Sequence, residues 1–443
     1  MTSFFLLYNR LVLKTSEILT KEIRKKLLLC FLALSCVQSV VIFDLGAPFK
    51  LVHVAGIVLS PLLLFYSPKY KYNFKICVLI VLLYVQTMVS YAIYGFSSWS
   101  LRMIFCTFAF LYTWWTSDDF SLDDWLWIGK NTSIFVFVCI IFNSFLQSDS
   151  FRYFLLQPKT NHPYYTSFFG GGVNLDASWL GLFTFLASAS PWWLPMLAVT
   201  FVFSILTNSR AGLLAGLCFL MWCVAQWICK YFFKKNTSIK FFSSWKRKQK
   251  NISILLFLVV TLGFFLVEGM VFLDHKKAQN ENITENNIQE NDTNFQGATS
   301  ALLDRFETVG DVEKDGGTRG RLNMWKWVPK EFKENVWGYG LGNGIKQIKE
   351  NDPSIYESNI HNIYFQILLE QGIVGAVITF LIIFRFVIKE FPSLFSNPLA
   401  AFLLCYLGLG AIQFRLLDVM MWFVVGAYMS LQSIQKQSKE SKI

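Results

Sequence analysis

The chain has 443 residues, of which 54% are hydrophobic and only 16% are charged. Soluble domains carry roughly 25% charged residues, so this composition excludes an ordinary soluble protein and indicates a membrane protein. The formal net charge is +11, but the basic residues are spread over several separate loops, which argues against binding to nucleic acid.

Apolar runs long enough to cross a bilayer, about 17–25 residues each, recur along the chain. Helices are the expected spanning element, because lipid cannot satisfy unpaired backbone groups. We therefore predict an all-α polytopic membrane protein with about 12 transmembrane helices. The predicted spans are 27–44, 49–66, 75–94, 100–116, 127–146, 177–190, 192–207, 211–229, 252–272, 361–384, 397–414 and 416–433.

A long polar segment divides the predicted spans into two groups. Residues 1–273 hold the first nine, residues 274–360 form a large loop, and residues 361–443 hold the last three and a tail. Within the loop, residues 278–296 are rich in Asn, Gln and Glu, a composition typical of mobile segments.

The later part of the loop carries helical periodicity. Apolar residues recur over 321–336, with lysines on other faces, which predicts an amphipathic helix at the membrane surface or over a cavity. Pro329 is expected to kink or break this helix. The four glycines within 338–344 predict a flexible turn after it.

Lys and Arg residues gather in alternate loops and set the orientation. They are frequent at the N-terminus, after the second and eighth spans, and in the tail, so these regions and both termini are predicted to be cytoplasmic. Residues 274–360 then lie on the outer side. One loop fits this assignment poorly, because residues 117–124 are acidic yet fall on the cytoplasmic side.

His361 stands where the large loop re-enters the membrane. An imidazole at that point is placed to accept a proton from a substrate hydroxyl. A histidine that merely caps the following helix or lies at the membrane interface is the alternative interpretation.

Three arginines and one aspartate are candidates for binding an anion. Arg210 lies between two predicted spans, where an arginine is costly unless it meets water, a partner or an anion. Arg319 and Arg321 precede the amphipathic helix, and their planar forks match phosphate oxygens. Asp418 lies near the outer edge of the last span, with pairing to Arg415 as its alternative role.

A base, several arginines and no Cys/His spacing typical of a metal site fit one reaction class. In glycan transfer from a polyprenyl diphosphate, arginines neutralise the charge that develops on the leaving diphosphate. A histidine accepts the proton of the attacking sugar hydroxyl.

Three segments carry a resemblance to a known family. They are Leu206-Thr207-Asn208-Ser209-Arg210-Ala211-Gly212, then Gly320-Arg321-Leu322-Asn323-Met324-Trp325, and finally His361-Asn362 followed after nine residues by Gly372-Ile373-Val374-Gly375. With these motifs the chain resembles the bacterial O-antigen ligase family, which shares its core with the O-antigen polymerases.

The resemblance implies a GT-C-like glycosyltransferase of the bacterial inner membrane, with its active site on the periplasmic side. Arg210 and Arg321 would contact the diphosphate of undecaprenyl-diphosphate-linked O-antigen, and His361 would activate a hydroxyl of lipid A-core. Arg319, Asn362 and Asp418 would support them. The reaction would complete lipopolysaccharide and invert the anomeric carbon. It would need no metal or other cofactor, and the protein would be surrounded by membrane lipids.

Two alternatives stay open. An O-antigen polymerase would join two lipid-linked glycans, although the match of His361-Asn362 with its spaced glycines favours a ligase. A transporter or flippase would carry charges throughout its spans, whereas the candidate charges here gather at one membrane face. For either transferase, Arg210, Arg321, His361 and Asp418 should converge on one laterally open cavity roofed by residues 321–336.

Overall fold

The computed structural model describes residues 19–37, 41–44, 48–66, 74–97, 99–146, 168–169, 173–206, 209–232, 316–355, 359–390, 397–413 and 416–440. The chain divides into two compact units. Unit 1 comprises residues 1–132 and 320–443, and unit 2 comprises residues 133–319.

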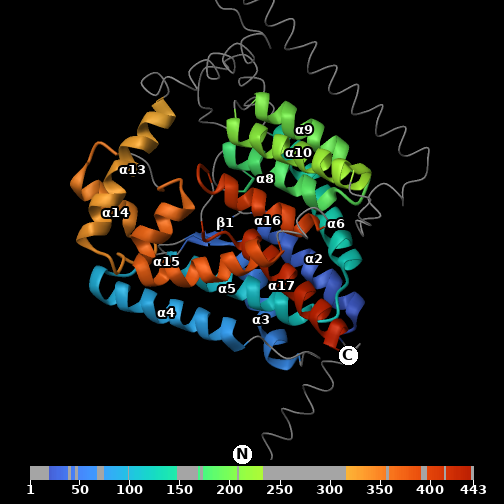
Figure 1. The fold of residues 1–443 in the computed structure, drawn as a ribbon, viewed down its shortest axis with the longest axis horizontal. Coiled ribbons are helices and arrows are strands. Elements are labelled where there is room, and N and C mark those ends of the chain that lie inside the picture. Colours follow the sequence, from blue (N-terminus) through green and yellow to red (C-terminus); the bar gives the residue numbers. More distant parts are fainter. Residues whose placement is uncertain are drawn as a thin grey trace, which may run out of the picture. The chain divides into compact units, whose positions relative to one another are not determined.

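Helices make up nearly all of the regular structure in these residues (Figure 1). Unit 1 also holds a short hairpin of β1 (Val41–Asp44) and β2 (Pro48–Lys50), which pair antiparallel. The helices of unit 1 are α2 (Lys21–Cys36), α3 (Leu51–Phe65), α4 (Phe74–Tyr94), α5 (Trp99–Thr116), the start of α6 (Leu122–Leu146), most of α13 (Gly316–Glu334), α14 (Gly344–Asn351), α15 (Ile363–Glu390), α16 (Pro398–Leu409) and α17 (Val419–Glu440). Those of unit 2 are the rest of α6, α8 (Val173–Ala187), α9 (Trp193–Leu206) and α10 (Arg210–Phe232).

The helical prediction is confirmed for most spans, since a helix coincides with each predicted span that the structure describes. The first span was wrong at its end, because α2 stops at Cys36 and residues 41–44 form β1. The β-branched pair Val41-Ile42 favours a strand, and Pro48 opens the partner strand where a helix could not continue. The predicted span 252–272 and the segment 278–296 lie outside the described residues.

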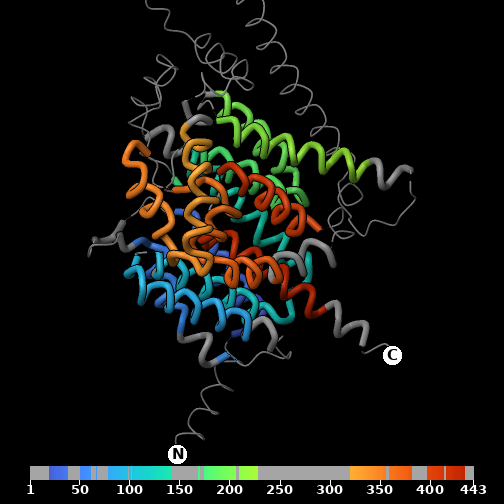
Figure 2. Tube along the Cα trace, turned by 60° about the vertical axis from the view of Figure 1, so that its left-hand side comes forward, coloured from blue at the N-terminus to red at the C-terminus, as the bar shows by residue number. Residues whose placement is uncertain are grey.

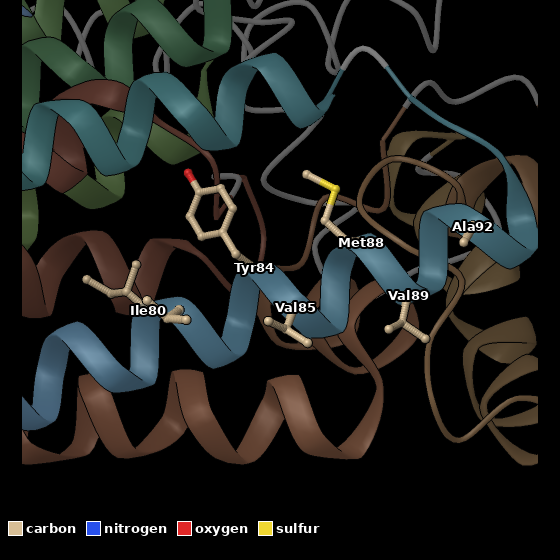
Figure 3. A pocket seen from close by; sticks show the side chains of 7 residues that line it. Ile80, Tyr84, Val85, Met88, Val89 and Ala92 are labelled. Carbon is tan, nitrogen blue, oxygen red and sulfur yellow. The ribbon is translucent and has the colours of Figure 1, made fainter.

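Two helices are long and apolar enough to cross a bilayer by length and composition, over Arg210–Trp227 and Ile363–Leu381, among the residues that the structure describes. Several shorter apolar helices accompany them, including Val78–Tyr94 of α4. An apolar pocket of about 600 Å³ lies along α4 (Figure 3). Val85, Met88 and Val89 on this face are about half exposed, as expected of a helix that contacts lipid rather than water.

A buried ionic cluster joins the ends of several helices of unit 1. The guanidinium of Arg24 donates to the carboxylates of Asp118 (3.0 Å) and Asp119 (2.9 Å). It also donates to the Thr116 carbonyl, at 2.7 Å. The Tyr66 hydroxyl donates to Asp118 at 2.7 Å. Arg24, Tyr66, Asp118 and Asp119, here the Arg24 cluster, fasten the start of α2 to the ends of α3 and α5.

The acidic loop 117–124 therefore lies against the basic start of α2. Lys21 and Lys25 pair with Asp124, at 2.6 Å and 3.5 Å. Partial burial alone would raise the pKa of Asp124, but hydrogen bonds from Lys21 and Ser121 outweigh it and hold this pKa below its ordinary value. This pairing explains how an acidic loop can lie on the same side as the basic segments, the point at which the predicted orientation fitted poorly.

α5 and α17 pack along each other within unit 1 (Figures 1 and 2). The absence of a side chain at Gly426 permits this, because a Cβ there would lie 2.6 Å from the Phe110 carbonyl oxygen. The Ser430 hydroxyl donates to the Ser117 carbonyl, next to the Arg24 cluster. The start of α17, after Asp418, thus lies at the opposite end of this helix pair.

At that opposite end, α15 is broken at Gly372, whose φ is 63° and ψ is −168°. In an unbroken helix the carbonyls of Leu369 and Glu370 would accept from the amides four residues later. Here the Leu369 carbonyl accepts from the Tyr339 amide (3.1 Å) and the Glu370 carbonyl accepts from the Gly340 amide (2.8 Å). The break therefore leaves neither carbonyl unbonded, as a helix within a membrane requires.

Residues 336–343, here the glycine strap, seal the break by close backbone contact. The Ile373 amide donates to the Val336 carbonyl at 2.8 Å. A Cβ at Gly372 would lie 2.2 Å from the Trp337 carbonyl carbon, and a Cβ at Gly338 would lie 2.4 Å from the Gly372 nitrogen. Only glycine at both positions lets the two backbones meet.

The strap is also bonded to α4. The Tyr91 hydroxyl donates to the Leu341 carbonyl, and the Asn343 side-chain amide donates to the Gly95 carbonyl, both at 3.0 Å. The turn predicted over 338–344 is present, and these hydrogen bonds argue against the flexibility predicted for it. These glycines permit backbone conformations, and close contacts with neighbouring backbone, that side chains would block. Hydrogen bonds hold the strap to α15 on one side and to the end of α4 on the other.

Removing Arg24 should destabilise the whole of unit 1. Arg24→Ala leaves Asp118, which is only 6% exposed, buried without its cation, a loss typically worth about 3–5 kcal/mol. Lys26→Ala on the exposed face of the same helix is the matched control. Thermal unfolding of the purified proteins in detergent measures both, and equal midpoints would contradict this account of the cluster.

Gly372→Ala should disrupt the junction of the strap and α15. The backbone conformation alone costs about 1–3 kcal/mol for a residue with a side chain, and the contact with Trp337 adds to that cost. Gly408→Ala in α16 is the control, since a Cβ there would meet nothing within 4 Å. We expect a lower unfolding temperature for Gly372→Ala only, and two variants of wild-type stability would show that the approach is looser than described.

Candidate active site

α13 is the predicted amphipathic helix of the large loop. It runs without interruption from Gly316 to Glu334, so the predicted break at Pro329 is wrong, while the predicted kink stays a prediction. Proline has no amide hydrogen, so the carbonyl four residues before Pro329 loses its usual helical donor. Pro329 is exposed, so this carbonyl lies on the exposed side of the helix. The packed side of the helix continues past the proline.

The two faces of α13 differ as the periodicity predicted. Met324 and Val328 are fully buried in a cluster with α14 and the start of α15. The exposed face carries a row of lysines, Lys326, Lys330 and Lys333. The helix therefore lies with its apolar side against α15.

Trp325 connects α13 directly to the segment that contains His361. Its indole N–H donates to the Ile360 carbonyl at 2.8 Å. Its ring meets the Phe365 ring edge to face, with centroids 5.6 Å apart. Because Arg321 precedes Trp325 by one helical turn, Arg321 and His361 stand on two segments that are in contact.

His361 has an unusual backbone. Its φ is +54°, the only positive φ of a non-glycine residue among those that the structure describes. Such a conformation is disfavoured for a residue with a side chain, and it persists only where the surroundings hold it. The residue is partly exposed, although the Nδ1 atom of its imidazole is buried.

The cap of α15 is Asn362, not His361. The Asn362 side-chain oxygen accepts from the Phe365 amide at 3.0 Å, and its carbonyl accepts from the Gln366 amide at 2.9 Å. The alternative interpretation of His361 as a capping residue therefore does not apply. His361 stands just before a helix N-terminus, whose positive end favours a bound anion.

Asp418 caps α17, since its carboxylate accepts from the Met420 amide at 3.1 Å. It is partly exposed, and it lies in the same unit as His361 and Arg321. The alternative partner of Asp418, Arg415, lies outside the described residues.

Arg210 begins α10 in unit 2. The turn before it is built by Ser209, whose hydroxyl accepts from the Gly212 amide at 3.2 Å and whose own amide donates to the Ser204 carbonyl at 2.7 Å. Gly212 allows close packing, because a Cβ there would lie 2.5 Å from that of Ala177. Arg210 is partly exposed at a helix N-terminus. Its approach to the residues of unit 1 stays a prediction.

Two charged residues of unit 1, one in α5 and one in α15, were not predicted from the sequence. Arg102 lies in the first turn of α5, with its guanidinium 5.0 Å from the Trp99 ring. Glu370 is buried in the apolar run of α15, where its carboxylate accepts from the Gln366 side chain (3.1 Å) and from the Gly342 amide. A charge within an apolar run was the available signal for both.

Comparison with known proteins reveals one family. Residues 195–380 match the family described as O-Antigen ligase. This segment, less than half of the chain, is therefore similar to the O-antigen ligase family. The match contains Arg210, Arg321 and His361 and ends before Asp418. No curated protein matches the chain.

The similarity to the O-antigen ligase family supports a general function. The family acts in lipopolysaccharide biosynthesis at a membrane, and it has glycosyltransferase-like activity as ligases and related polymerases. Its substrates are, in general, lipid-linked O-antigen and lipid A-core. Within the matched segment, the described structure brings the segments of Arg321 and His361 together.

Proposed function

We propose that the chain is an O-antigen ligase that transfers an O-antigen glycan from undecaprenyl diphosphate to a sugar hydroxyl of lipid A-core. The observation that carries this proposal is the contact between the helix of Arg321 and the segment of His361, through Trp325 and Ile360. It brings together the segments that carry a candidate anion-binding group and a candidate base, within a region that matches the O-antigen ligase family.

Each candidate residue has a defined role in this reaction. The acceptor hydroxyl oxygen attacks the anomeric carbon, and His361 takes its proton. The bond between that carbon and the diphosphate oxygen breaks, and the leaving diphosphate keeps the electron pair. Arg321 and Arg210 bind the diphosphate and neutralise its growing charge. Attack opposite the leaving group inverts the anomeric carbon.

The remaining candidates support this geometry. Asn362 orients the start of α15, and Asp418 orients the start of α17. Arg319 lies in α13 with Arg321, and we assign it a supporting role in binding the anionic donor. The reaction needs no metal in this mechanism, because the arginines carry the charge-neutralising role that a divalent cation would otherwise have.

We also propose an inner-membrane topology with the site on the periplasmic side and both termini in the cytoplasm. The Arg24 cluster lies with the basic start of α2 and with the later part of α17. The glycine strap and the start of α17 lie at the opposite end of the α5–α17 pair. This arrangement supports placing the strap, and His361 with it, on the outer side.

A polymerase of the same family is the second candidate, because the family match covers both activities. Purified protein in liposomes, supplied with lipid-linked O-antigen and lipid A-core in excess EDTA, separates the two. We expect lipopolysaccharide to form. Longer lipid-linked glycans with no modified lipid A-core would identify a polymerase, and a requirement for added Mg²⁺ would overturn the metal-free mechanism.

Replacing His361 should abolish most of the transfer. General-base assistance is typically worth about 10²–10⁴-fold, so we expect a loss of that size. His361→Asn is the informative variant, because asparagine tolerates a positive φ and loses only the base. His361→Ala adds backbone strain as a comparison. Transfer by His361→Asn at the wild-type rate would contradict the role of the imidazole.

Lysine should not substitute functionally for Arg210 and Arg321, the two arginines proposed to bind the diphosphate. Arg210→Lys and Arg321→Lys keep the charge and lose the planar fork, so transfer should fall roughly 10–100-fold, the equivalent of one or two charge-assisted hydrogen bonds. Arg319→Lys in the same helix is the control and should be milder. An essential Arg319 with a dispensable Arg321 would show that the wrong arginine was assigned.

A further inference from the structure

We propose that Trp325 is a positioning residue that holds His361 in its left-handed conformation and so places the imidazole at the acceptor hydroxyl. This inference rests on the proposed function, in which His361 is the base. It goes further by assigning a role to a residue that touches neither the diphosphate nor the reacting hydroxyl.

The first observation is that the backbone is held immediately before His361. The carbonyl of Ile360 accepts from the Trp325 indole at 2.8 Å. The Ile360 side chain is 1% exposed and packs into the cluster of Met324 and Val328. Both the side chain and the carbonyl of the residue before His361 are therefore held by α13.

The second observation is that the backbone is also held immediately after His361. Asn362 caps α15 through the Phe365 amide, at 3.0 Å. The Ile363 amide donates to the Gly410 carbonyl at 2.7 Å, so the start of α15 is tied to the end of α16.

The φ of +54° at His361 is the consequence of these two attachments. A left-handed residue with a side chain is disfavoured by about 1–2 kcal/mol, so it relaxes when one attachment is lost. Among the interactions that hold the backbone before His361, the hydrogen bond of the Trp325 indole can be removed alone. A single substitution to another aromatic residue deletes this bond and keeps a ring in place. Relaxation would turn the imidazole away without changing the residues that bind the diphosphate.

Trp325→Phe is the variant that tests this, because it keeps a ring against Phe365 and deletes the donor. Trp327→Phe is the matched control. Trp327 lies two residues away on the same helix and donates its indole N–H to the Asp352 carboxylate at 3.2 Å, away from Ile360. Transfer is measured with full-length protein in liposomes, with lipid-linked O-antigen and lipid A-core, as kcat and KM for each substrate.

A misplacement of about 1 Å can cost 10²-fold in rate, so Trp325→Phe should lower kcat roughly 10–100-fold with both KM values unchanged. Trp327→Phe should leave kcat within a few fold. The deciding measurement is a double-mutant cycle with His361→Asn. If Trp325 acts through the imidazole, Trp325→Phe has no further effect once His361 is asparagine.

Several outcomes would overturn the inference. One is an equal fall in kcat in both backgrounds, which would make Trp325 a general structural residue. Another is a Trp325→Phe protein that does not fold, because the hydrogen bond would then support the fold rather than the site. A third is wild-type kcat in Trp325→Phe while His361→Asn is inactive. By contrast, full activity of His361→Asn would refute the proposed function itself.

Discussion

The break of α15 at Gly372 is the constraint on which the rest of unit 1 depends. A helix in lipid cannot be interrupted unless other groups take its freed carbonyls. The strap amides of Tyr339 and Gly340 take them. This joins a segment outside the helix bundle to α15 by backbone hydrogen bonds. Because α13 precedes the strap and α14 follows it, the same junction brings α13 beside the start of α15, where Trp325 reaches the residue before His361.

This arrangement explains how a long loop can hold a catalytic geometry. Loops are usually the most mobile part of a protein, whereas a base and its anion clamp must be held within a fraction of an ångström. Here the loop segment 336–343 is bonded to two helices, α4 and α15. The clamp candidate Arg321 and the base candidate His361 are therefore carried by segments in contact with each other.

Much of the fold could be predicted from sequence, because apolar runs of membrane length leave few alternatives to helices. The motifs at Arg210, Arg321 and His361 lie within the segment that matches the O-antigen ligase family. What hydropathy could not predict were contacts between distant residues. The pairing of Arg24 with Asp118, and the meeting of Gly338 with Gly372, join positions far apart in the chain. The unbroken helix through Pro329 shows tertiary context overriding local preference.

Hydrogen exchange of the strap tests the central claim most directly. The amides of Tyr339, Gly340 and Ile373 lie outside regular helical hydrogen bonding, so an unattached loop would exchange them within seconds. If they donate to Leu369, Glu370 and Val336, they should exchange as slowly as amides in the middle of α5 and α17 in the purified wild-type protein. Rapid exchange at these three amides, with α5 and α17 protected, would contradict the account.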